Sequence, residues 1–69
     1  MIRKLPKIPW KGKIYTFDYR LSELRQIQQG KYPRFIHLNN IENERLQYAI
    51  ETHNKSLIYS NMRNLEWKF

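Results

Sequence analysis

Polar and apolar side chains alternate between Lys13 and Tyr19, which is the two-residue period of a β-strand that buries one face. One side of this segment carries Ile14, Thr16 and Asp18, and the other carries the aromatic residues Tyr15, Phe17 and Tyr19. Three rings on one face could also form a platform that stacks nucleic-acid bases. A short chain needs its largest apolar side chains inside, so we expect the aromatic side to face the core.

The segment after this strand has the spacing of a helix. Its apolar positions recur every three to four residues, at Leu21, Leu24 and Ile27 or Gln28. This spacing predicts a short helix whose N-terminus is capped by Asp18 or Ser22. Gly30, followed three residues later by Pro33, is typical of a helix end.

A second strand and a longer helix are predicted next. Arg34–Leu38 is a short apolar run between turn-forming residues and therefore predicts a strand. Asn39 or Asn40 then caps a helix, and Glu42, three residues after Asn39, completes a capping box in which Asn replaces Ser or Thr. One apolar stripe continues along this helix at Leu46, Ala49, Ile50, His53 and Leu57.

The remaining residues predict a β-hairpin, with strands at Leu57–Ser60 and Leu65–Phe69 about a turn at residues 61–64. The element order is then β-α-β-α-β-β. We expect a single small α+β domain over residues 13–69, in which two helices cover one face of a small mixed sheet. Residues 1–12 precede it as an extended basic arm, because Pro6 and Pro9 each remove a backbone donor.

Basic residues are concentrated near the N-terminus. The 69-residue chain has a formal net charge of +7; residues 1–13 hold five basic and no acidic side chains, whereas residues 14–69 hold eight and six. The five are Arg3, Lys4, Lys7, Lys11 and Lys13, and four more that extend this surface are Arg20, Arg25, Lys31 and Arg34. Clustered cations neutralise phosphates, so nucleic acid is the leading expected partner. A solvated arm without a partner is the alternative reading.

Aromatic residues at the C-terminus suggest a different kind of partner. Trp67 and Phe69, with Tyr59 across the predicted hairpin, either close the core or form an exposed patch. If the last strand lies at the edge of the sheet, its unpaired backbone groups are suited to pairing with another protein or a second copy of this chain. A protein-interaction or regulatory module is therefore the alternative function.

The residue types required for catalysis are scarce. The chain has no Cys, its two histidines are His37 and His53, and its two glycines are Gly12 and Gly30. A metal site needs three or four converging ligands, and a phosphate loop needs more glycines. We therefore expect a non-enzymatic protein without a metal, cofactor or small-molecule ligand. No apolar run approaches the roughly 20 residues of a membrane span, and no signal-peptide pattern is visible. We expect no membrane partner and a cytoplasmic location.

One stretch resembles a known family. His53, Asn61 and the run Asn64-Leu65-Glu66-Trp67 resemble the central segment of HNH-type endonucleases over fifteen residues. The resemblance implies a metal-assisted nuclease site at His53. However, Thr52 stands where that family has another His, and the spacing from Asn61 to the run is one residue shorter than in the family. We interpret this stretch as a hairpin turn that uses Asn twice.

Overall fold

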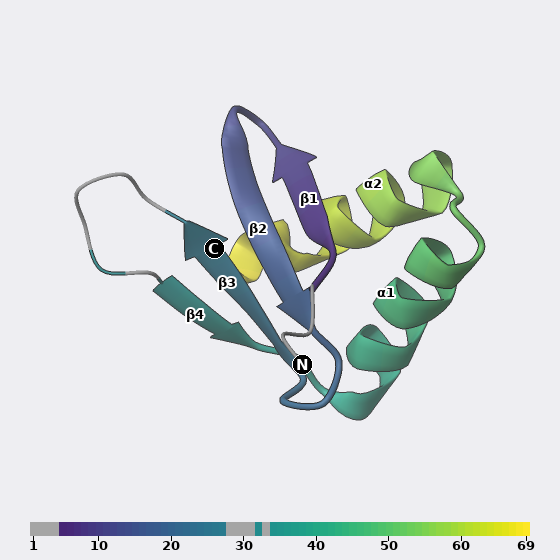
Figure 1. Ribbon diagram of the computed structural model, residues 1–69, viewed down its shortest axis with the longest axis horizontal. Helices are drawn as coiled ribbons and strands as arrows, with labels where there is room; N and C mark the ends of the chain where they lie inside the picture. Colours follow the sequence, from purple (N-terminus) through teal and green to yellow (C-terminus); the bar gives the residue numbers. More distant parts are fainter. Residues whose placement is uncertain (1–4, 28–31, 33) are drawn as a thin grey trace.

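The protein contains a four-stranded antiparallel sheet followed by two helices (Figure 1). A computed structural model describes residues 5–27, 32 and 34–69. The strands are β1 (Lys7–Trp10), β2 (Lys13–Asp18), β3 (Glu23–Ile27) and β4 (Arg34–His37). Each strand pairs with its neighbour in the sequence, so the sheet order is β1-β2-β3-β4. The helices are α1 (Asn40–Glu51), α2 (Lys55–Leu65) and the short 3-10 helix η1 (Glu66–Lys68).

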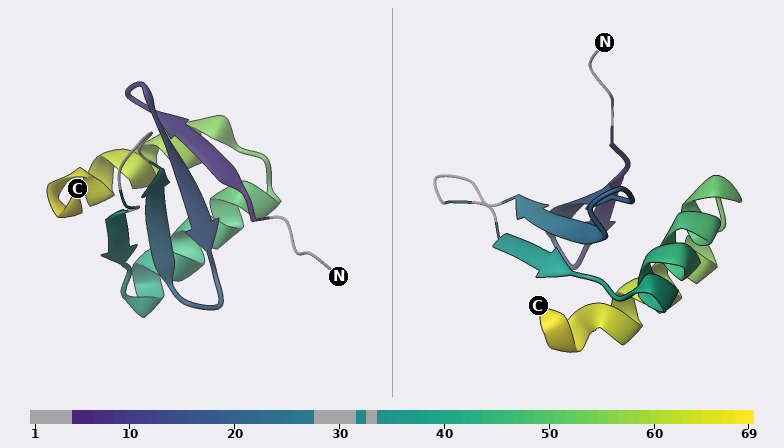
Figure 2. Two further views of the ribbon diagram at one scale, coloured as in Figure 1. Left: turned by 60° about the vertical axis from the view of Figure 1, so that its left-hand side comes forward. Right: turned by 90° about the horizontal axis from the view of Figure 1, so that it is seen from below.

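Both long helices lie on one side of the sheet, which is clearest in the right-hand view of Figure 2. The α+β class is therefore confirmed. The predicted element order is partly wrong, because all four described strands precede both helices. The sheet is also antiparallel rather than mixed, since every strand pair in the described chain runs in opposite directions.

The core fills the space between the sheet and the helices. Alternate strand residues supply one half of it, namely Ile8, Tyr15, Phe17, Leu24 and Ile36. Leu46 of α1 and Met62 and Leu65 of α2 supply the other half. The aromatic side of β2 faces the core as predicted at Tyr15 and Phe17, whereas Tyr19 lies just beyond the strand and is exposed. We refer to the helix-covered side of the sheet as the inner face and the opposite side as the outer face.

The segment predicted as a short helix is strand β3. Its buried residues are Leu24 and Gln26, which alternate as strand residues do. Pairing with β2 on one side and β4 on the other supplies backbone hydrogen bonds, whereas an isolated helix this short is unstable. The helical spacing was misleading, because Leu21 and Ile27 are both exposed. Gly30, the predicted helix end, lies outside the described residues.

The predicted C-terminal hairpin is also wrong, since helix α2 and η1 occupy this part of the chain. Asn54 caps α2 by accepting a hydrogen bond from the backbone N–H of Leu57 at 3.1 Å. Met62 and Leu65 are buried three residues apart, and Ile58 packs against the core one turn earlier. The proposed turn at residues 61–64 therefore lies within the helix.

Helix α1 begins as predicted and ends earlier than its apolar stripe suggested. Asn39 is the N-cap, and the capping box with Glu42 is present. At the C-terminal end the backbone N–H of His53 donates to Ile50 and that of Asn54 donates to Ala49. This is a Schellman motif, in which His53 takes the left-handed position at φ 52°. His53 is consequently an exposed turn residue rather than part of the apolar stripe.

Replacing His53 by glycine is expected to raise the free energy of unfolding by about 0.5–1 kcal/mol. Glycine adopts the left-handed conformation without the steric cost that a Cβ atom imposes. Urea denaturation of His53→Gly beside His53→Ala measures the effect. Alanine retains the Cβ atom, so an equal gain in both variants would contradict the role of the backbone conformation.

The predicted arm is partly incorporated into the sheet. Residues 7–10 form β1, which pairs with β2 from Lys7 opposite Thr16 to Trp10 opposite Lys13. Lys11 and Gly12 form the turn between these strands, with φ values of 49° and 77°. Two positive φ angles are typical of a type I′ hairpin turn. Among the described residues, no helix has the length and apolar character required to cross a membrane.

Candidate nucleic-acid interface

The net charge of the protein belongs entirely to the half of the sequence that forms the sheet. Residues 1–37 contain nine basic and two acidic side chains, and residues 38–69 contain four of each. The first half therefore carries the whole net charge of +7, and the helical half is neutral. A polyanionic ligand is consequently attracted to the sheet rather than to the helices.

The strand register sorts the side chains of the sheet onto its two faces. Directly opposed residues of antiparallel strands point to the same side. A row on the outer face runs across all four strands through Lys7, Thr16, Arg25 and Phe35. Within the described residues, no element packs against this face (Figure 2). Lys7 and Phe35 are exposed, and Arg25 and Thr16 are half-buried.

Apolar side chains accompany these cations on the outer face. Ile14 is 47% exposed, Ile27 is 45% exposed, and the two lie opposite each other toward the β1–β2 turn. Pro9 lies beside Ile14 on β1. The Arg25 guanidinium lies over the ring of Phe35 with its central carbon 5.1 Å from the ring centroid, a cation–π contact. Phe35 nevertheless remains 50% exposed.

The two ends of the outer face differ in charge. Asp18, Glu23 and His37 form the row farthest from the β1–β2 turn. One Asp18 carboxylate oxygen accepts a hydrogen bond from the backbone N–H of Leu21 at 3.2 Å, which supports the β2–β3 loop. These carboxylates repel phosphates, so an anionic ligand is favoured on the remainder of the face.

The other predicted basic residues do not share one surface. The register places Lys13 and Arg34 on the inner side of the sheet, at strand ends where both are exposed. Lys11 forms an ion pair with Glu66 of η1 and lies near the Trp10 ring. Arg20 is exposed in the β2–β3 loop, at the end opposite the β1–β2 turn. The remaining three, Arg3, Lys4 and Lys31, lie outside the described residues.

The aromatic residues that the sequence offered as a stacking platform are unavailable to a ligand at two of three positions. Tyr15 is buried and its ring stacks on Phe69, with 4.8 Å between ring centroids. Its hydroxyl accepts a hydrogen bond from Gln26 at 3.4 Å. Burial raises the pKa of Tyr15 above 10.0, against the lowering effect of nearby Arg34, and Glu66 adds to the rise. The Tyr15 hydroxyl therefore stays protonated, and both Tyr15 and Phe17 pack in the core.

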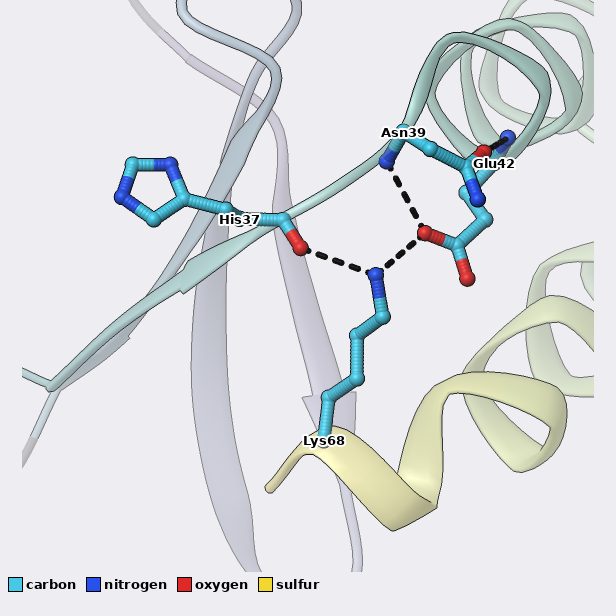
Figure 3. A network of polar contacts seen from close by, with 4 residues as sticks. All are labelled: His37, Asn39, Glu42 and Lys68. Carbon is cyan, nitrogen blue, oxygen red and sulfur yellow. Dashed lines mark hydrogen bonds and ion pairs between the residues drawn. The ribbon is translucent and has the colours of Figure 1, made fainter.

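A polar network joins η1 to the junction between β4 and α1 (Figure 3). The Lys68 ammonium donates to the backbone carbonyl of His37 at 3.0 Å and forms an ion pair with Glu42. Glu42 also accepts the backbone N–H of Asn39 at 2.9 Å. Burial alone would raise the pKa of Glu42, but the hydrogen bonds from Lys68 and Asn39 outweigh it and lower the pKa below 4.5. The His37 ring points away from this network. The network therefore joins η1 to the start of α1 without using the imidazole.

The structure does not assemble the residues that resemble the HNH endonucleases into a site. His53 is exposed between the two helices, and the Asn61 amide donates to the Leu57 carbonyl of its own helix at 2.9 Å. Throughout the described part of the chain, no group of three or more His, Cys, Asp or Glu side chains is arranged to hold a metal ion.

Phe35 is the aromatic residue of the outer face that sequence reasoning did not select. The run Arg34–Leu38 is too short for the sequence to indicate which of Phe35 and Ile36 faces the core. In the structure Ile36 is buried, so its neighbour Phe35 faces outward. Comparisons with protein-family models, with curated proteins and with solved structures find no match to this chain.

Proposed function

We propose that this protein is a non-enzymatic nucleic-acid-binding protein that uses the outer face of its sheet. The observation that carries the proposal is that the sheet half holds the entire net charge while the helices cover only the inner face. Lys7 and Arg25 stand on the same outer-face row, two strands apart. Neither forms a salt bridge with another described residue. No described carboxylate therefore competes with a phosphate for either cation.

This surface differs from the basic arm expected from the sequence alone. The predicted arm placed five cations in an extended segment, whereas β1 fixes Lys7 against the sheet. A cation on a paired strand loses less conformational entropy on binding than one on a free segment. Lys11 contributes less than expected, because Glu66 of the same protein partly neutralises it. Lys13, Arg20 and Arg34 surround the sheet and add to its potential.

The double variant Lys7→Gln, Arg25→Gln is expected to bind nucleic acid with a weaker salt dependence. Each phosphate contact contributes about 0.7–0.9 to the slope of log K against log salt, so losing two lowers the slope by about 1.5. Fluorescence anisotropy of a labelled mixed-sequence oligonucleotide across a salt series measures it. The matched control is Arg45→Gln, Lys55→Gln, which removes the same charge from exposed helical positions.

A slope that falls equally in both variants would mean that only net charge matters, and the outer face would have no special role. Absence of any salt-dependent binding by the wild type would reject the proposed function itself. Because Arg25 is half-buried, thermal unfolding of both variants is measured to test whether its replacement leaves the protein folded.

A protein partner is the second candidate, supported by the exposure of Trp67. This residue is 77% exposed, and the Lys68 ammonium lies 5.1 Å from the centroid of its ring. Phe69, by contrast, is half-buried and packs on Tyr15, and Tyr59 is 39% exposed and lies against Trp10, so Trp67 is the most exposed of the three aromatic residues predicted to form the patch. Because the predicted C-terminal strand is a helix, pairing with another protein or a second copy would use the edge strands β1 or β4. Binding of a protein partner through Trp67 is expected to persist at high salt and to be lost in the Trp67→Ala variant.

A further inference from the structure

We infer that the preferred ligand of the outer face is single-stranded nucleic acid, with an unstacked base lying against Phe35. This inference rests on the proposed function and specifies its substrate class. Phe35 is half exposed, it belongs to the cationic row, and Arg25 lies against its ring. An aromatic ring beside a cation offers a base a stacking surface and its phosphate a counter-charge at the same point.

The apolar character of the surface favours a single strand over a duplex. Proteins read the edges of paired bases mainly with polar side chains that enter a groove, and they hold the duplex backbone with polar and cationic groups. Here the outer face presents Ile14 and Ile27 at nearly half exposure, opposite each other on β2 and β3, and Phe35 at half exposure on β4, the strand next to β3. The apolar faces of bases complement such side chains, and only unpaired bases expose those faces.

The charge pattern limits where the strand can lie. Asp18 and Glu23 occupy the end of the outer face near the β2–β3 loop and disfavour phosphates there. The row of Lys7, Thr16, Arg25 and Phe35 occupies the middle of this face, and the apolar residues Ile14 and Ile27 lie between that row and the β1–β2 turn. A single strand is therefore expected to cross the sheet along the row from Lys7 to Phe35, with its bases toward Ile14 and Ile27.

Substitution of Phe35 by alanine tests the inference. The probes are a labelled single-stranded oligonucleotide of about ten nucleotides, within the usual site sizes, and the duplex made from it. We expect Phe35→Ala to weaken single-strand binding about fivefold or more, because base stacking on an aromatic side chain is worth ~1–3 kcal/mol. Duplex affinity and the salt slope should both change little. Phe35→Tyr, which keeps the ring, should retain single-strand affinity.

Three results separate the possibilities. Selective loss of single-strand affinity in Phe35→Ala, recovered in Phe35→Tyr, supports the inference. Salt-dependent binding that is equal for single strand and duplex and insensitive to Phe35→Ala overturns it and leaves the proposed function standing. No salt-dependent binding to either probe overturns both. The side chain of Phe35 lies at the surface, so its truncation is not expected to unfold the protein.

Discussion

Replacing Met62 by alanine is expected to lower the free energy of unfolding by about 2–5 kcal/mol. Met62 is fully buried between α2 and the inner face of the sheet, so truncation removes its apolar contacts and leaves a cavity. A domain of this size typically has only about 3–5 kcal/mol of stability, so this one change removes most of it. Urea denaturation followed by circular dichroism measures the loss.

The same variant distinguishes helix α2 from the hairpin that the sequence suggested. In a hairpin, Met62 would lie in the exposed turn at residues 61–64 and its truncation would cost little. The matched control is Ser60→Ala, an exposed position of the same helix, which should change stability by less than about 0.5 kcal/mol. Similar small effects in both variants would contradict the burial of α2 against the sheet.

Replacing Glu42 by alanine is expected to cost about 1.5–3 kcal/mol at neutral pH. The substitution removes a charge-assisted hydrogen bond and leaves the Lys68 ammonium without its carboxylate partner. It also removes one half of the capping box at the start of α1. Both side chains of the ion pair are mostly buried, so solvent screens the pair less than a surface pair. Glu44→Ala, at an exposed position of the same helix, is the control.

This contribution depends on pH in a defined direction. The folded protein lowers the pKa of Glu42 below its ordinary value of 4.5. A carboxyl group whose pKa is lower in the folded than in the unfolded protein stabilises the folded state at pH values above its unfolded-state pKa. That stability is lost as the pH falls through its folded-state pKa. The difference in unfolding free energy between wild type and Glu42→Ala should therefore be constant near neutral pH and shrink below about pH 4.5. A difference that is independent of pH would show that the charge of Glu42 does not contribute.

Strand β2 and helix α1 were predictable because their signals are long and locally complete. Alternation from Lys13 to Asp18 spans a whole strand, and the capping box of Asn39 and Glu42 fixes where the helix begins. The signals for β3 and α2 are weaker. Leu21, Leu24 and Ile27 have helical spacing by coincidence, and only pairing with two neighbouring strands makes the segment a strand.

The error at α2 has a similar origin. Leu57-Ile58-Tyr59 is rich in residues that favour strands, yet the spacing of Ile58, Met62 and Leu65 matches one helical face. The cap at Asn54 was concealed because His53, rather than glycine, ends the preceding helix. Tertiary burial of Met62 therefore decided between two locally plausible structures.

The candidate site was predictable in its charge and not in its geometry. Counting residues was sufficient to locate the cations in the first part of the chain. Their distribution over two faces depends on the register, which places Arg25 opposite Phe35 only because β3 is a strand. A helix at that position would have separated these two side chains, so the error in β3 concealed the row as well.

The meander order of the sheet has a consequence for how the chain reaches its native state. Adjacent pairing of β1 with β2, β2 with β3 and β3 with β4 involves residues close in sequence, so the contact order of the sheet is low. Contacts between distant segments arise where the end of the chain returns, as when Phe69 stacks on Tyr15 and Tyr59 meets Trp10. Docking of the C-terminal helix therefore closes the longest loops described in the fold, and it carries a larger loop-closure entropy than any of the strand pairings.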